Sequence, residues 1–293
     1  MLKQISKFAI PVVIMTLVLP FAGCGVSQDK YDELNSQLTS LQNEYNDAQS
    51  ELASAQTEID KLNADLTGQG AKLDQAQSSY DSLQKQASDL ENKLNAILNT
   101  TATQYYRFTY KYVSYDWALP VPLRTYFYYK DLPRPTKYDT MVIDSYADNV
   151  MNILSQQVED AALTNDMKPT DVINLVATFV RSLPHSDEDA RTPFDGYPRY
   201  PVETLFDQGG DSEDNSILIA SLLIRERYDV VFLLFQQPKH LAVGVNAPTA
   251  IGYRWEYQGN WYYYLEPNEK NWELGELPTP FRGTQPVIIP ISH

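Results

Sequence analysis

The chain has 293 residues with a single cysteine, and its 23 basic and 38 acidic residues give a formal net charge of -15. This acidic excess argues against binding of nucleic acids or anionic membrane surfaces by the folded part, because both need clustered Lys and Arg. A single cysteine excludes an internal disulfide. The length fits one domain and an accessory segment, and 43% hydrophobic residues suffice for a packed core.

The first 24 residues are typical of a bacterial export signal. Lys3 and Lys7 precede an apolar run over residues 8–22, which is too short to span a bilayer comfortably. The run ends in Phe21-Ala22-Gly23-Cys24, which resembles a lipobox, the site at which lipoproteins are cleaved and acylated. We therefore expect a lipoprotein signal peptide over residues 1–23. Lipid attached to Cys24 would anchor the protein outside the cytoplasm, on the cell membrane or on an outer membrane where the host has one. An ordinary cleaved signal or a retained anchor is the alternative.

Two rows of residues repeat every seven positions through the next segment, and all of their members except Gln69 are apolar. The first row is Tyr31, Leu38, Tyr45, Leu52, Ile59, Leu66, Leu73, Tyr80, Ala87 and Leu94, and the second is Leu34, Leu41, Ala48, Ala55, Leu62, Gln69, Ala76, Leu83, Leu90 and Ile97. A strict seven-residue repeat of this length cannot stay on one face of a straight helix. It predicts an α-helical coiled coil over residues 24–100, through which the protein associates with itself.

Gly68 and Gly70 fall near the middle of this repeat, and each weakens a helix by about 1 kcal/mol relative to Ala. Two interpretations stay open. In one, Thr67 to Gly70 turns the chain into an antiparallel hairpin. In the other, the helix is continuous. The heptad phase passes the glycines without a slip, which favours the continuous helix.

Residues 101–293 have a different chemistry and form the predicted folded domain. The expected strands are 105–112 and 123–129, separated by a Pro-containing loop, and then 230–235, 241–245, 252–257 and 261–265, the last two joined as a hairpin through Gln258-Gly259-Asn260. The expected helices are 145–159, 170–183 and 216–227, with a loop over 185–200. Helices followed by an antiparallel sheet predict the α+β fold class.

Three short blocks carry residues with catalytic chemistry. They are Gly209-Gly210-Asp211-Ser212-Glu213-Asp214, Lys239-His240-Leu241-Ala242-Val243-Gly244-Val245 and Tyr264-Leu265-Glu266-Pro267. Ser212 opens a helix, where the dipole favours developing negative charge. His240 opens a strand, and Glu266 ends a later one. A nucleophile, a base and a group that orients the base are needed in this kind of arrangement.

In this order, the three blocks resemble the transglutaminase-like (papain-related) domain of exported bacterial and archaeal proteins. That family's first block normally reads G-D-C-E-D, and its Cys is the nucleophile; Ser212 stands at that position here. The resemblance implies a papain/transglutaminase-like core, a helix packed on an antiparallel sheet, with catalytic positions at Ser212, His240 and Glu266. The segments 179–184, 197–205 and 272–278 also match relatives in kind.

Each of these positions has a second interpretation. Ser212 is a good helix cap, and a serine hydroxyl is a weak nucleophile at its ordinary pKa, so we expect an inactive site. Some relatives, the periplasmic calcium-dependent cysteine proteases among them, bind Ca²⁺ with D-x-E-D carboxylates, which implies a calcium site at Asp211, Glu213 and Asp214. Alternatively, these acids only compensate the helix dipole. No other cofactor is expected.

These features favour a membrane-anchored, extracytoplasmic lipoprotein that presents a non-catalytic transglutaminase-like domain on a coiled-coil stalk. Its cleft would bind a peptide or a cell-surface polymer. The alternative is a serine amidohydrolase, peptidase or acyltransferase that uses Ser212, His240 and Glu266. In a third hypothesis, the coiled coil is the active part and serves assembly.

Overall fold

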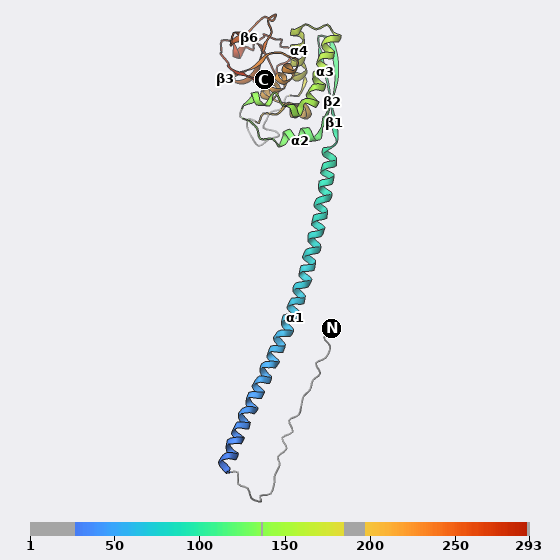
Figure 1. Cartoon of the computed structure of the whole chain (residues 1–293). Helices are drawn as coiled ribbons and strands as arrows, with labels where there is room; N and C mark the ends of the chain where they lie inside the picture. The colour runs from blue at the N-terminus through green and yellow to red at the C-terminus, as the bar shows by residue number, and fades with distance from the viewer. Residues whose placement is uncertain (1–26, 136, 185–196, 292–293) are drawn as a thin grey trace. The chain divides into compact units, whose positions relative to one another are not determined.

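The computed structural model describes residues 27–135, 137–184 and 197–291. The predicted signal peptide, Cys24 and most of the predicted loop over 185–200 lie outside these residues. The chain divides into two compact units, one ending at Lys85 and the other starting at Gln86, so that the boundary falls inside the first helix (Figure 1). In the part of the chain that is described, no helix is long and apolar enough to cross a membrane.

Helix α1 (Gln28–Leu98) contains 71 residues, none of them buried. It continues through Gly68 and Gly70, so the expected continuous helix is confirmed and the hairpin is not formed. The Thr67 hydroxyl donates to the Asn63 carbonyl at 2.8 Å, as in an unbroken helix. The large side chains of the heptad rows are at least half exposed; Leu52, for example, is 70% exposed. A stripe of this kind needs a partner, which is compatible with a coiled coil.

We expect Leu52→Asp to weaken self-association of the full chain by about 2 kcal/mol or more per helix, because it removes a buried leucine and places a charge in the seam. Ser54→Asp adds the same charge outside both rows and should have little effect. Sedimentation velocity checks this. A full chain that sediments as a monomer before any substitution would contradict the coiled coil.

The second unit is mixed α/β. Its strands are β1 (Thr101–Tyr110), β2 (Val113–Pro122), β3 (Val230–Gln236), β4 (Lys239–Asn246), β5 (Arg254–Tyr257), β6 (Asn260–Leu265) and β7 (Val287–Pro290). Its α-helices are α2 (Leu123–Asp131), α3 (Asp148–Thr164), α4 (Pro169–Ser182), α5 (Pro201–Asp207) and α6 (Ser212–Arg225), and its 3₁₀ helices are η1 (Tyr138–Met141), η2 (Ser145–Ala147) and η4 (Thr279–Phe281). The predicted helices and most of the predicted strands are confirmed within a few residues.

Two antiparallel sheets are present among the described residues. β1 and β2 form a two-stranded sheet, and the larger sheet has the order β5-β6-β4-β3-β7. The predicted hairpin between β5 and β6 is confirmed: Tyr257 pairs with Asn260, and Gln258 and Gly259 between them both have positive φ. Helix α6 packs on β3 and β4, and it also contacts α4, which packs on β1. This packing places α6, which begins in the block 209–214, against β4, which carries the block 239–245.

Two predictions in the segment 113–129 are wrong. The expected Pro-containing loop is strand β2, whose Tyr115, Trp117, Leu119 and Val121 alternate into the core. Prolines are tolerated there because a two-stranded sheet has only edge strands.

The expected strand over 123–129 is helix α2. Its aromatic composition favours a strand, but Thr125, Tyr126 and Tyr129 are buried at helical spacing. The Tyr126 ring stacks on Phe206 at 4.0 Å. Tertiary packing therefore outweighs the intrinsic β preference of the segment. Strand β7 is absent from the predicted elements because three aliphatic residues between two prolines give no clear periodicity.

Candidate functional site

Helix α6 begins in a reciprocal capping arrangement. Asp211 is the N-cap residue, and its carboxylate accepts from the Asp214 amide at 3.0 Å, while the Asp214 carboxylate accepts from the Asp211 amide at 3.4 Å. Each acid therefore satisfies one of the free amides of the helix start. The hypothesis that Ser212 caps the helix is wrong, because Asp211 has that role and Ser212 is the first helical residue.

Asp214 also forms a buried ion pair. Its Oδ1 accepts from the Arg199 amide at 2.6 Å, and its Oδ2 lies 3.4 Å from Arg199 Nη1, with both residues at most 4% exposed. Gly210 is required above this carboxylate, since a Cβ there would lie 2.6 Å from the Asp214 Cβ. The block 209–214 is thus joined to the segment 197–205 through Arg199, a contact that the sequence did not predict.

Ser212 is directed toward its neighbour in the chain. Its Oγ donates to Glu213 Oε2 at 2.9 Å, and Glu213 Oε1 pairs with Lys239 Nζ at 3.2 Å. Among the described residues, no hydrogen bond joins Ser212 to His240 or Glu266. The hydroxyl proton is therefore held by a carboxylate that is itself paired, and not by the imidazole.

His240 and Glu266 come together, as predicted. His240 Nε2 lies 3.4 Å from Glu266 Oε2, and Glu266 is only 1% exposed. The Tyr264 hydroxyl donates to the same Oε2 at 2.6 Å, and Oε1 accepts from the Asn268 amide at 3.0 Å. This network fixes the carboxylate that faces the imidazole.

The protonation state of this network follows from its geometry. Burial alone would raise the pKa of the Glu266 carboxyl, but the hydrogen bonds from His240, Tyr264 and Asn268 outweigh burial and hold that pKa at about 2. Burial and the neighbouring Glu266 charge raise the pKa of the Tyr264 hydroxyl. At neutral pH, Glu266 is thus a carboxylate and Tyr264 a proton donor to it. With Nε2 facing Glu266, Nδ1 is the imidazole nitrogen left to accept a proton from another group.

The imidazole is also stacked. Phe281, from η4, lies against the His240 ring with centroids 4.9 Å apart and an interplanar angle of 16°. The His240 side chain is 14% exposed. Sequence reasoning missed Tyr264 and Phe281. Tyr264 has the signal of lying two residues before Glu266, on the same face of the strand, whereas Phe281 reaches the site from a distant turn and has no such signal.

Two further hydrogen bonds hold the start of α6 beside His240 and Glu266. The Ser216 hydroxyl donates to the carbonyl of Leu241, the residue after His240, at 2.9 Å. Asn215 Nδ2 donates to Asn268 Oδ1 at 2.8 Å, two residues beyond Glu266. The fold therefore brings the three predicted blocks to one place, although the Ser212 hydroxyl bonds elsewhere.

The three carboxylates of the predicted calcium site do not converge. Asp211 caps the helix, Glu213 pairs with Lys239, and Asp214 pairs with Arg199. No group of three His, Cys, Asp or Glu side chains suited to a metal ion occurs among the described residues. These contacts do not support calcium binding, which stays a prediction.

Comparison with known proteins finds no matching family model, no matching curated protein and no matching solved structure. The resemblance to transglutaminase-like domains accordingly rests on the sequence blocks themselves.

Proposed function

We propose that this chain is an exported, lipid-anchored protein that carries a transglutaminase-like domain on a coiled coil, and that the domain binds a peptide or an envelope polymer without catalysis. The observation that carries the proposal is the Ser212 hydroxyl, which donates to Glu213 at 2.9 Å and has no hydrogen bond to His240. Serine becomes a nucleophile when a base accepts its proton. In this arrangement the hydroxyl proton faces a carboxylate that is already paired with Lys239, and the imidazole does not receive it.

The anchor and the self-association belong to the same proposal. The lipobox-like sequence at Cys24 supports attachment to a membrane by acyl chains. The exposed heptad rows of α1 support pairing with a second copy.

An exposed aromatic face supports binding of a polymer. Trp261 on β6 is 45% exposed, and the Arg254 guanidinium lies 4.6 Å from its ring centroid. Aromatic rings of this kind offer flat apolar area to a sugar or a peptide. Trp255 instead is partly buried and packs against Phe235 of the core, with ring centroids 5.7 Å apart. Trp261 is therefore the tryptophan of this pair that is available to a ligand.

A second candidate is a serine hydrolase or acyltransferase. It is favoured by the intact group of His240, Glu266 and Tyr264, whose hydrogen bonds are those that a general base needs. In this case Ser212 would turn from Glu213 toward His240 when a substrate binds.

Labelling with a fluorophosphonate probe separates the two candidates. We expect the full chain to remain unlabelled at Ser212 and to cosediment with insoluble peptidoglycan. The control is Ser221→Ala, which removes a buried serine further along the same helix. Labelling at Ser212 that disappears in His240→Ala would overturn the non-catalytic proposal and establish the enzyme.

A further inference from the structure

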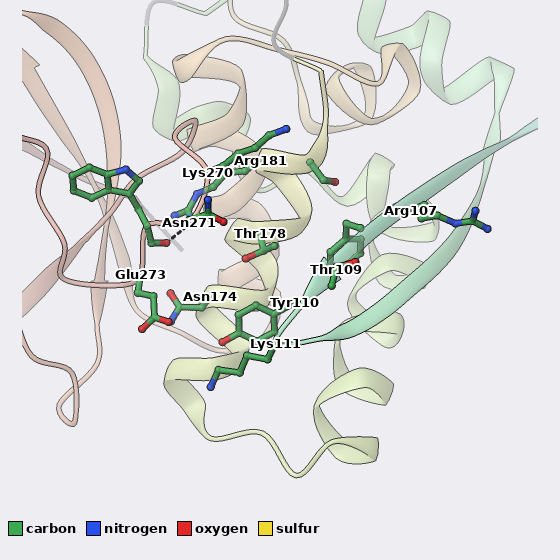
Figure 2. Close-up of a pocket in the computed structure, with 13 residues that line it drawn as sticks. Arg107, Thr109, Tyr110, Lys111, Asn174, Thr178, Arg181, Lys270, Asn271 and Glu273 are labelled. Atoms are coloured by element: carbon green, nitrogen blue, oxygen red, sulfur yellow. Dashed lines mark hydrogen bonds between the residues drawn. The ribbon is translucent and has the colours of Figure 1, made fainter.

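A second site lies in a pocket formed by β1, α4 and the segment 270–273. Its volume is about 480 Å³, within the range of small-molecule sites, and its walls are mostly polar (Figure 2). Neither Ser212, His240 nor Glu266 lines it. A polar ligand is therefore expected here.

Arg181 is the most informative residue of this pocket. It is 4% exposed, its Nε donates to the Glu266 carbonyl at 2.7 Å, and its Nη1 donates to the Trp272 carbonyl at 2.5 Å. Its Nη2 is buried without a hydrogen-bond partner. The Tyr110 hydroxyl, in the same pocket, is likewise buried and unpartnered. Folded proteins rarely leave buried donors unpaired, so two in one pocket indicate a missing acceptor.

The charge of the pocket indicates what that acceptor is. Its basic lining residues are Arg107, Lys111, Arg181 and Lys270, against one acidic lining residue, Glu273. Arg107 pairs with Asp116, and Lys111 pairs with Asp171, each at 2.5 Å. Arg181 and Lys270 have no carboxylate at ion-pair distance among the described residues. Burial lowers the pKa of Arg181 to about 10, so its guanidinium stays charged at neutral pH.

We propose that this pocket binds a small organic acid, with the ligand carboxylate on Arg181 and Lys270 at one end and the ligand's other polar groups on Tyr110 and Glu273 at the opposite end (Figure 2). Arginine recognises carboxylates in this way because its planar fork matches the two oxygens. Arg181 Nη2 and the Tyr110 hydroxyl are buried, so a ligand reaches them only when covering side chains move. Lys270 and Asn271 are exposed, and we expect them to shift when the ligand binds. The proposal does not depend on the transglutaminase-like assignment. A peptide C-terminus and a sugar acid share this chemistry.

Titration calorimetry of the full chain tests this site. The probes are N-acetyl-alanyl-alanine, its C-terminal amide and glucuronate. We expect at least one of the two acids to bind. If that acid is the peptide, its C-terminal amide should bind at least about tenfold more weakly than the free peptide. Lys270→Gln should weaken binding of that acid about three- to tenfold. Lys137→Gln, an exposed lysine away from the pocket, should leave it unchanged.

Arg181→Lys provides a second variant, since it keeps the charge and loses the free Nη2. We expect it to weaken binding further than Lys270→Gln, with folding checked by circular dichroism. If Arg181→Lys does not fold, Lys270→Gln alone decides. Binding of neither acid, measurable binding of the peptide that its amide equals, or equal affinity of Lys270→Gln and Lys137→Gln for the bound acid would each overturn the proposal.

Discussion

Replacing Asp214 by Asn is expected to lower the free energy of unfolding of the second unit by about 3 kcal/mol. Asp214 is 2% exposed and faces the 4% exposed Arg199, so replacing its carboxylate weakens a buried ion pair and the hydrogen bonds that it accepts from the Arg199 and Asp211 amides. Breaking a buried pair from one side typically costs about 3–5 kcal/mol. Asn retains one acceptor oxygen, which places the expected loss at the lower end of that range.

Urea unfolding followed by tryptophan fluorescence measures this loss. The four tryptophans all lie after residue 101, so the signal reports the second unit and not α1. The control is Glu213→Gln, which removes the neighbouring carboxylate. Its partner Lys239 is 68% exposed, so we expect a change of about 1 kcal/mol or less.

The same experiment tests whether these carboxylates form ion pairs or bind calcium. An ion-pair role predicts that added Ca²⁺ changes neither curve. Stabilisation by Ca²⁺ that is lost in Asp214→Asn would instead assign the carboxylates to a metal ion. Equal stabilities of Asp214→Asn and Glu213→Gln would contradict the structural role of the Arg199 pair.

The helices whose apolar residues recur at a regular spacing were the most predictable from the sequence. The heptad rows predicted α1, and the buried apolar stripe of α4 predicted that helix, because each is set by many residues together. Helix α2 and strand β2 were assigned wrongly for opposite reasons. The aromatic residues of α2 favour a strand in isolation, and Pro120 and Pro122 conceal a strand whose inward residues alternate correctly.

Within the site, the resemblance predicted the residues and the pairing of His240 with Glu266, but not the contacts of the other residues. His240 and Glu266 meet because β4 and β6 are adjacent in the sheet, an order that the chain sequence alone does not fix. The partners of Ser212 and Asp214 depend on side-chain rotamers and on Arg199 from another segment. The hydrogen bonds of Arg181, which leave only its Nη2 without a partner, were unpredictable for the same reason, since they arise from the approach of the segment 266–272 to α4.

Ser212→Cys is expected to create a reactive thiol. A cysteine at a helix N-terminus beside a histidine has its pKa lowered from about 8.5 into the range of about 3.5–7.5. The Glu213 carboxylate opposes this shift, so we expect a pKa lowered by at least about one unit. Below the ordinary thiol pKa, each unit gives about ten times more thiolate. At pH 6, Ser212→Cys should therefore react with iodoacetamide about tenfold faster than an ordinary exposed thiol.

The most direct measurement is the pH dependence of that reaction in the full chain. Ser114→Cys supplies the ordinary exposed thiol, and the unsubstituted chain, whose single cysteine is Cys24, supplies the background. Our account predicts that His240→Ala in the Ser212→Cys chain slows the reaction at pH 6 about tenfold and moves the thiol pKa back toward its ordinary value. Equal rates with and without His240 would show that the imidazole does not serve position 212, which would contradict a preserved transglutaminase-like site.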